Sequence, residues 1–233
     1  EKLWDVYHPL VELCGGEAIR KLLEVKEYKN NDDNKLMIPP LNGRHPATVL
    51  TLGIGNDILS ELRLKLDIPN AKFYGADPVE LAGNLYRTIG EYHPVAVGAE
   101  DGMAESHVLI NGQYRTVQLA VTSFWNFLRN VSLNRIDYLL IDNEGHEYDL
   151  LPILTRRSLI ERNITICQIN VELHGPLKDY HQTSTTFYDI LAHFQSWSPF
   201  APILVTEPWS HARATYVNFE NPYCLRTYLV EKI

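Results

Sequence analysis

Short apolar runs alternate with stretches of helical periodicity along most of this sequence, and that order restricts the chain to few folds. The apolar runs expected to form strands cover residues 48–52, 72–76, 95–97, 138–141 and 164–173. Apolar residues at helical spacing lie between and after them, at residues 58–66, 79–89, 146–159 and 185–194. Nearly continuous apolar strands separated by helices are typical of a parallel sheet covered on both faces. The pattern predicts an α/β fold with a Rossmann-like, doubly wound, mostly parallel sheet, which binds ligands at the carboxyl ends of its strands.

The two ends of the chain and one internal stretch depart from this alternation. Residues 3–29 have the apolar spacing of two helices separated at Gly15-Gly16, so an N-terminal helical cap is expected. Three late strands are expected, at residues 203–206, 214–217 and 225–230. Asn111-Gly112 stands between two strand-like runs, which predicts a β-hairpin inserted between the third and fourth parallel strands.

Charge and hydrophobicity exclude some classes of partner. The formal net charge is -8, and no basic run is longer than Arg156-Arg157. Binding to nucleic acid requires clustered Lys and Arg, so no nucleic-acid partner is expected. No run of about 18 apolar residues occurs, so no membrane span is expected in this sequence. The sequence does not indicate an oligomeric state.

The cysteines and two glycosylation sequons bear on the compartment. The three cysteines form no CxxC pair, which argues against a zinc ribbon. Cys167 lies in an apolar run and is expected to be a buried thiol, and counting alone allows one disulfide, for example Cys14 to Cys224. Sequons begin at Asn130 and Asn163. They favour the secretory pathway (the Golgi lumen) or secretion over a cytoplasmic location.

A glycine-containing turn follows the first strand, in the stretch 51–57. Its glycines allow a tight turn and close approach of the backbone to a ligand, but Ile58 replaces the third glycine of a GxGxxG pattern. A tight strand–helix turn without a ligand explains it equally well. Asp77, before Pro78, ends the next strand. Its carboxylate is suited to a ribose diol or to capping a helix, and the two roles are compatible.

The fourth strand ends in a charged cluster, Asp142-Asn143-Glu144-Gly145-His146-Glu147. Three acids and a histidine thus stand where a doubly wound sheet presents its active site. A simpler explanation is that acids at the start of a helix are stabilised by its dipole.

This last segment carries a family resemblance. Residues 136–151 resemble the FkbM-type S-adenosylmethionine-dependent methyltransferases, in which an Ile-Asp pair, an apolar strand and Asp-x-Glu-Gly precede a leucine-bearing helix. The glycine turn, the strand ending at Asp77-Pro78 and the fifth strand ending in Val171-Glu172 agree with the family in order and spacing. The likeness covers about residues 48–174. Within the family, the sequence is most similar to a divergent animal branch.

The resemblance implies a class I methyltransferase whose cofactor is S-adenosylmethionine, with S-adenosylhomocysteine as product. Its cofactor site would comprise Thr51, Gly53, Gly55, Asn56, Asp57, Asp77, Pro78, Glu100, Asp101, Asp142 and Asn143. Asp77 is expected on the ribose, and Glu100 or Asp101 beside the adenine. The family usually has an acid where Thr51 stands, which helps to hold the cofactor's amino group. Residues 1–233 would form one domain, with a cap (1–47), a cofactor-binding core (48–174) and an acceptor-side part (175–233).

Methyl transfer to a hydroxyl needs a group that removes its proton. The candidates at the sheet edge are His174, Asp142, Glu144, Glu172 and His146. His174 is the first choice because histidine titrates near neutrality and this one follows the fifth strand. Strand alternation places Asn170, Glu172 and His174 on one face. Asp142 and Glu172 also offer oxygen ligands to a divalent metal, although no metal is favoured here.

The expected acceptor is a glycan or small molecule, namely a sugar hydroxyl or another small hydroxylated compound, because the family is known for such acceptors. The alternative is a catalytically degenerate methyltransferase fold that serves as a binding or scaffold protein, which Thr51 favours. An NAD-dependent oxidoreductase is a further alternative, and the missing third glycine argues against it. The last is a metal-dependent hydrolase built on Asp142, Glu172 and His174.

Overall fold

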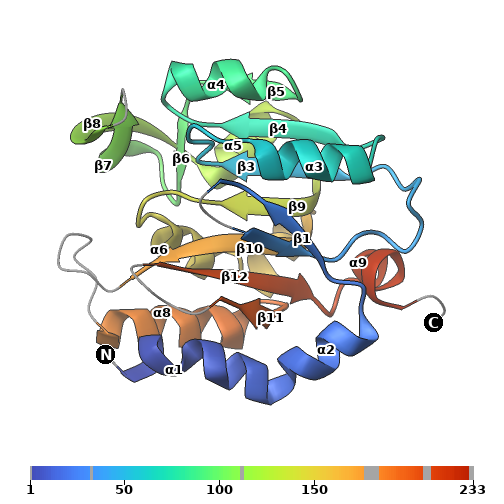
Figure 1. Ribbon diagram of the computed structural model, residues 1–233. Helices are drawn as coiled ribbons and strands as arrows, with labels where there is room; N and C mark the ends of the chain where they lie inside the picture. The colour runs from blue at the N-terminus through green and yellow to red at the C-terminus, as the bar shows by residue number, and fades with distance from the viewer. Residues whose placement is uncertain (1, 32–33, 111–112, 176–183, 207–210, 231–233) are drawn as a thin grey trace.

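The computed structural model describes residues 2–31, 34–110, 113–175, 184–206 and 211–230 (Figure 1). Its central sheet has seven strands in the order β11-β12-β10-β9-β3-β4-β5. They are β3 (Thr48–Leu52), β4 (Lys72–Ala76), β5 (Glu91–His93), β9 (Arg135–Ile141), β10 (Thr165–His174), β11 (Phe200–Val205) and β12 (His211–Asn218). The strands from β5 to β10 are parallel to one another, and β12 is antiparallel to both its neighbours. The predicted α/β fold with a mostly parallel sheet is confirmed.

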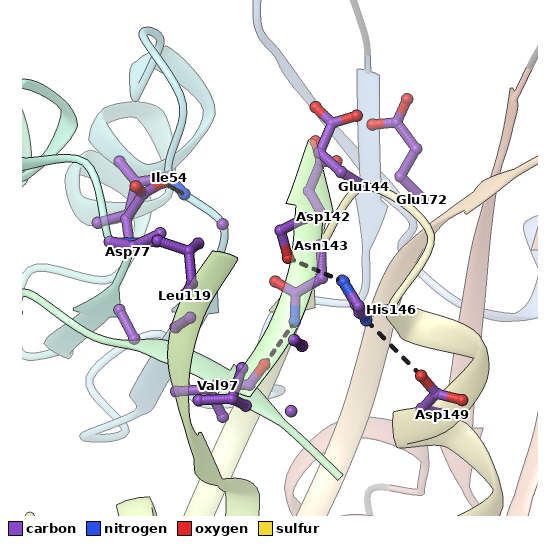
Figure 2. A pocket seen from close by; sticks show the side chains of 18 of the residues that line it. Ile54, Asp77, Val97, Leu119, Asp142, Asn143, Glu144, His146, Asp149 and Glu172 are labelled. Carbon is purple, nitrogen blue, oxygen red and sulfur yellow. Dashed lines mark hydrogen bonds and ion pairs between the residues drawn. The ribbon is translucent and has the colours of Figure 1, made fainter. Parts of the chain in front are cut away.

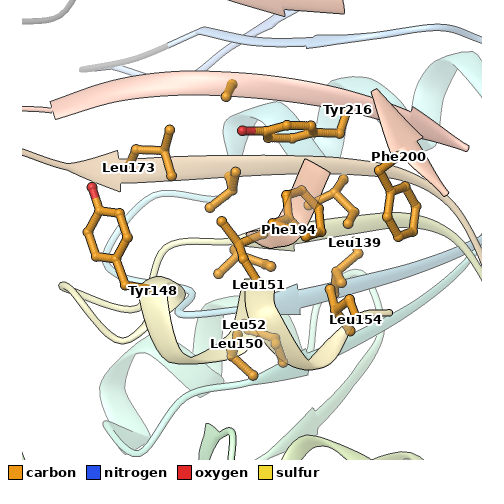
Figure 3. Close-up of a cluster of buried hydrophobic side chains, with 14 of the residues drawn as sticks. Leu52, Leu139, Tyr148, Leu150, Leu151, Leu154, Leu173, Phe194, Phe200 and Tyr216 are labelled. Atoms are coloured by element: carbon orange, nitrogen blue, oxygen red, sulfur yellow. The ribbon is translucent and has the colours of Figure 1, made fainter. Parts of the chain in front are cut away.

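Strand alternation buries both faces of this sheet. In β9, Leu139 and Ile141 point into one core cluster, while Tyr138 and Leu140 point into the other. Figure 3 shows the first cluster, which residues of α1 (Lys2–Val11), α6 (Glu147–Leu150) and α8 (Ser184–Trp197) complete. The second cluster lies under α3 (Leu59–Asp67), α4 (Glu80–Tyr86) and the N-terminal strands. Apolar residues at most positions of the central strands therefore produce a sheet with two covered faces, as the sequence predicts.

The helices lie in the expected order, but one is broken. They are α3 (Leu59–Asp67), α4 (Glu80–Tyr86), α5 (Phe124–Asn130), α6 (Glu147–Leu150), α7 (Arg156–Arg162) and α8 (Ser184–Trp197). The single helix expected over 146–159 is wrong, because a 3₁₀ turn (η2, Leu151–Ile153) separates α6 from α7. Pro152 lies in that turn and has no N–H to continue an α-helix. Thr155 then caps α7 by accepting a bond from the Ser158 N–H at 3.1 Å.

The N-terminal cap is only partly helical. Its helices are α1 (Lys2–Val11), a π-helical turn (η1, Glu12–Gly16) and α2 (Glu17–Leu22), and α1 packs beside α8 and β11 (Figure 1). The prediction of helix up to residue 29 is wrong, because β1 (Lys26–Lys29) pairs antiparallel with β2 (Asn34–Met37). In β1 the side chain of Tyr28 is buried and its neighbours are exposed or half-buried, an alternation that strands produce. β2 then reaches across the sheet to contact β10 and β12.

Two further expectations about strands are corrected. Residues 225–230 form no strand, because a capped turn at α9 (Pro222–Cys224) leads into a π-helical segment (η4, Leu225–Leu229). Asn221 caps this turn through its side-chain oxygen, and Pro222 follows it. The third strand, β6 (Ala96–Gly98), belongs to a separate sheet, and the short β5 takes the expected place at the edge of the main sheet.

The predicted hairpin is confirmed and is longer than expected. β7 (Gly102–Ile110) and β8 (Gln113–Ser123) pair antiparallel, and β8 also pairs with β6. The Asn111-Gly112 turn itself lies outside the described residues. The hairpin projects beside the main sheet (Figure 1).

Cys167 is not the buried thiol that its apolar surroundings suggest. It forms a disulfide with Cys224, with 5.1 Å between their Cα atoms, which joins β10 to α9. The suggested pairing of Cys14 with Cys224 is therefore wrong, and Cys14 is an exposed free thiol. Among the described helices, none combines the length and the apolar character needed to cross a membrane.

Candidate active site

A cleft of about 1610 Å³ opens at the carboxyl ends of β3, β4, β9 and β10. The glycine turn after β3 forms one wall, the segment after β9 forms another, and the β7–β8 hairpin contributes a third. In Figure 2, Asp77 and Ile54 lie on one side, Glu144 and Glu172 lie on the other, and Asp142 lies between. The fold thus brings the predicted cofactor residues and the predicted acid–base residues to a single cavity.

The glycine turn needs glycine for two reasons. Gly53 and Gly55 have φ values of 76° and 64°, in the left-handed region that side chains other than glycine rarely adopt. A Cβ atom at Gly53 would also lie 1.8 Å from the carbonyl oxygen of Asp142. The turn is therefore packed directly against the end of β9.

Asp77 holds this turn in place. Its Oδ2 accepts bonds from the backbone N–H groups of Ile54 at 2.8 Å and Gly55 at 3.2 Å. Its Oδ1 accepts one from the Val79 N–H at 2.7 Å, in the turn that leads into α4. Burial raises the pKa of the Asp77 carboxyl, against the effect of these backbone bonds. The prediction that Asp77 is the helix N-cap is wrong, because Val79 occupies that position, and the ribose contact stays a prediction.

Most other predicted cofactor residues line the same cleft, namely Asn56, Asp57, Pro78, Glu100, Asp101, Asp142 and Asn143. Asp101 accepts a bond from the Ser123 N–H at 2.8 Å, and this bond lowers the pKa of its carboxyl. Asn143 donates to the carbonyl of Val97 at 3.0 Å. The segments after β6 and β9 are thereby joined across the cleft.

Thr51 does not belong to this lining. Its side chain is buried, and its Oγ1 lies 3.0 Å from the hydroxyl of Tyr86, beneath the turn. The prediction that Thr51 contacts the cofactor is therefore wrong for its side chain. Position 51 lies inside strand β3, where its side chain points into the core instead of the cleft.

The acid–base residues gather around Asp142. His174 Nε2 lies 3.4 Å from Glu144 and 3.9 Å from Asp142, while its Nδ1 lies 3.0 Å from Glu147. Arg213 forms ion pairs with Glu172 and, at 3.3 Å, with Asp142. The strands β10 and β12 pair Glu172 directly with Arg213. Asn170, Glu172 and His174 therefore meet one charge network, as the predicted alternation requires.

The contacts of His174 with Glu144 and Glu147 favour its protonated form. Burial lowers its pKa, but hydrogen bonds to Glu144 and Glu147 outweigh that effect and raise the pKa to about 11. An imidazolium has no lone pair with which to take a proton. The raised pKa argues against titration of His174 near neutrality, and its role as the general base stays a prediction.

Glu172 has the pKa near neutrality that the sequence analysis expected of His174. Burial raises its pKa to about 8, and the negative charge of Asp142 adds to the rise against the attraction of Arg213. Burial also opposes the ionisation of Asp142, but Arg213, a hydrogen bond with Glu172 and the charge of His174 together lower its pKa. The pair thus consists of a carboxylate, Asp142, beside a carboxyl group that exchanges its proton near neutral pH.

His146 has a different environment. Its Nε2 lies 2.8 Å from Ser106 Oγ and 3.1 Å from the Glu105 carbonyl, so it joins the hairpin to the start of α6. A hydrogen bond to Asp149 raises its pKa against the effect of burial. His146 lines the cleft, but its contacts are those of a residue that holds the hairpin wall.

Asp142, Glu144 and His174 each offer one ligand atom, and these atoms lie within 4.8 Å of one another. A divalent cation would need the proton of His174 Nε2 to leave first. The positive charges of His174 and Arg213 already stand beside the carboxylates that would bind it. The charge network therefore gives no reason to assign a metal.

Three functional residues were missing from the sequence-based set. Glu147 positions His174, and its place in the Asp-x-Glu-Gly-x-Glu pattern could have identified it. Arg213 lies opposite Glu172, which only the register of β10 and β12 reveals. Lys35 reaches the cleft from the N-terminal cap and has no sequence signal.

Comparisons with known proteins identify a family for this chain. The sequence profile of the methyltransferase FkbM domain matches residues 12–198. Among solved structures, the chain is similar to a fibrillarin/Nop5p complex (10% identity, TM-score 0.47, 77% of this chain and 75% of that chain). It is also similar to magnesium protoporphyrin IX methyltransferase from Synechocystis PCC 6803 (11% identity, TM-score 0.41, 76% and 72%). The fibrillarin pre-rRNA processing protein of Methanococcus jannaschii is a third (7%, 0.45, 83% and 82%). No curated protein shows significant similarity to the sequence.

Proposed function

Because the chain belongs to the FkbM methyltransferase family, we propose that it transfers a methyl group from S-adenosylmethionine to a hydroxyl oxygen of a small molecule or glycan. One observation carries the proposal. The cleft joins the glycine turn to a carboxyl group, Glu172, whose pKa is about 8.

The residues of the cleft fit this cofactor. Gly55 has an open side, because no atom lies within 4 Å of the position that a Cβ would take there, and a ligand can approach the backbone of the turn. Asp77 lies where a ribose diol could meet its carboxylate, and Glu100 and Asp101 lie farther along the same cavity. When bound, S-adenosylmethionine supplies an electrophilic methyl group on a positively charged sulfonium.

The acid–base network offers a group that can accept the proton of the acceptor hydroxyl. Bound S-adenosylmethionine would supply the methyl group, and the ionised form of Glu172 would take the proton that the acceptor hydroxyl loses. A base whose pKa lies near the working pH is ionised in a large fraction of molecules and still binds the proton strongly. Asp142 stays ionised beside it, and Arg213 holds both carboxyl groups in place. His174 keeps its proton and balances the negative charge of Glu144 and Glu147.

The proposed acceptor is a sugar hydroxyl or a similarly hydroxylated small molecule. Polar residues from β9 and β10 form one side of the cleft, while Leu119 and Val121 of the hairpin form an apolar side. A sugar ring presents hydroxyl edges and apolar C–H faces, which suit such a pair of walls. The acidic net charge of -8 favours this acceptor over a nucleic acid.

We further propose a secretory or extracellular location. The Cys167–Cys224 disulfide supports it, because disulfides persist in oxidising compartments. Both sequon asparagines are exposed, and they precede β9 and β10, at the sheet edge opposite the cleft. Glycans at Asn130 and Asn163 would leave the cleft accessible.

A methyl-transfer assay tests the proposal. Wild-type protein is incubated with S-adenosylmethionine carrying a labelled methyl group and a panel of free sugars and glycans. We expect labelled product with a base-stable ether linkage, and a loss of transfer in Glu172→Gln. A folded protein that binds S-adenosylmethionine but labels no acceptor in the panel would support the alternative, a degenerate fold that serves as a binding or scaffold protein.

A further inference from the structure

The N-terminal cap places one lysine in the wall of the cleft. Lys35 is the second residue of β2, and it lines the same cavity as the glycine turn and Asp142. It is 6% exposed, an unusual degree of burial for a lysine. The strand that carries it contacts β10 and β12, so the ammonium is held in place by the N-terminal part of the chain.

The contacts of Lys35 leave part of its ammonium for a ligand. Its Nζ donates to Ser60 Oγ at 2.9 Å and to Glu61 Oε1 at 3.2 Å. Ser60 in turn donates to the other carboxylate oxygen of Glu61 at 2.7 Å. A lysine ammonium has three N–H donors, and within the described residues these two acceptors meet it. The third donor can therefore serve a group in the cleft.

The surroundings of Lys35 indicate which part of the cleft its third donor can reach. Ser60 and Glu61 belong to the first turn of α3, directly after the glycine turn. The charge of Lys35 also contributes to the low pKa of Asp142, which places the ammonium within electrostatic reach of the end of β9. Lys35 thus faces the part of the cleft between the glycine turn and the charge network. The methyl group must leave the cofactor beside that network.

We propose that Lys35 binds the carboxylate of the methionine moiety of S-adenosylmethionine. This inference rests on the proposed function and adds a binding residue from the cap. The sulfur that carries the methyl group is joined by a short chain to the only carboxylate of the cofactor, so that carboxylate lies near the transfer site. A buried ammonium with a remaining donor matches it in charge and in hydrogen bonding. Burying an ion pair often adds little net stability. A role in ligand binding therefore gives a reason for the burial of the Lys35–Glu61 pair.

Two ligands that differ only in this group test the inference. Calorimetric titration with S-adenosylmethionine and with decarboxylated S-adenosylmethionine is made on wild type, Lys35→Met and the control Lys21→Met. Lys21 is an exposed lysine of α2 that does not line the cleft. We expect Lys35→Met to weaken binding of S-adenosylmethionine by roughly 10- to 100-fold, as for loss of a hydrogen bond to a charged group. Binding of the decarboxylated ligand should change by less than about twofold, and Lys21→Met should bind both ligands as wild type does.

Lys35→Met leaves the buried Glu61 carboxylate without its partner, so the double variant Lys35→Met/Glu61→Gln is included to keep the pocket neutral. It should show the same selective loss for the ligand with the carboxylate. Equal losses for both ligands, or no loss for either, would overturn the inference while leaving the proposed function in place. Failure of wild type to bind S-adenosylmethionine would instead refute the proposed function, and the inference with it.

Discussion

The disulfide between Cys167 and Cys224 yields a prediction whose size follows from the chain topology. The two cysteines are separated by 57 residues, and the bridge joins β10 to α9 across a buried region. In the chain-entropy model a loop of that length removes about 14 cal/mol/K of entropy from the unfolded chain, which is about 4 kcal/mol at 25 °C. Replacing both cysteines with alanine should lower the free energy of unfolding by about that amount.

The assay is urea unfolding of wild type, the double variant Cys167→Ala/Cys224→Ala and the control Cys14→Ala, followed by circular dichroism. Cys14 is exposed and free, so its substitution should change the free energy of unfolding by less than about 0.5 kcal/mol. Peptide mapping without reductant should recover Cys167 linked to Cys224. A double variant as stable as wild type, or a recovered peptide that links Cys14 to Cys224, would contradict this prediction.

Three further predictions concern the cleft. The rate of methyl transfer should rise as the pH increases through about 8, because Glu172 accepts a proton only when ionised, and Glu172→Gln should lose roughly 10²- to 10⁴-fold in rate together with that pH dependence. Gly53→Ala should lower the free energy of unfolding by about 1–3 kcal/mol and weaken cofactor binding in calorimetry, whereas Gly43→Ala, where a Cβ would meet no atom within 4 Å, should do neither. The raised pKa of His174 contributes stability that is fully present below its unfolded value of 6.5 and is lost as pH rises toward about 11. Urea titrations of wild type across this range should therefore show a decline that His174→Gln flattens, and identical pH profiles for the two proteins would show that His174 is not the group responsible.

Local sequence patterns were sufficient for the strands that form the middle of the sheet. β3 and β9 are buried at nearly every position, and most of their residues are apolar, as a buried parallel strand requires. The same reasoning failed for β1. The spacing of Tyr28 fits the preceding helices, but in the structure Tyr28 is the buried residue of a four-residue strand. β5 has only three residues, too few to show a period.

The site was predictable in its members but not in its chemistry. The Asp142–Glu147 segment and β10 identified the acid–base residues because the ends of parallel strands meet at one edge. The roles of Glu172 and His174 depend on which charges each one faces. Arg213 reaches Glu172 through the register of β12, and Glu147 reaches His174 from α6. Such pairings, like the partner of Cys167, are set by tertiary contacts that no local pattern contains.

The proposed function requires that this cleft bind S-adenosylmethionine and its product. The decisive measurement is calorimetric titration of S-adenosylhomocysteine into wild type and into Asp77→Asn. We expect binding in the micromolar range, weakened by about tenfold or more in Asp77→Asn, which corresponds to about 1.4 kcal/mol. A folded wild-type sample that binds no S-adenosylhomocysteine would show that the cleft is not a cofactor site.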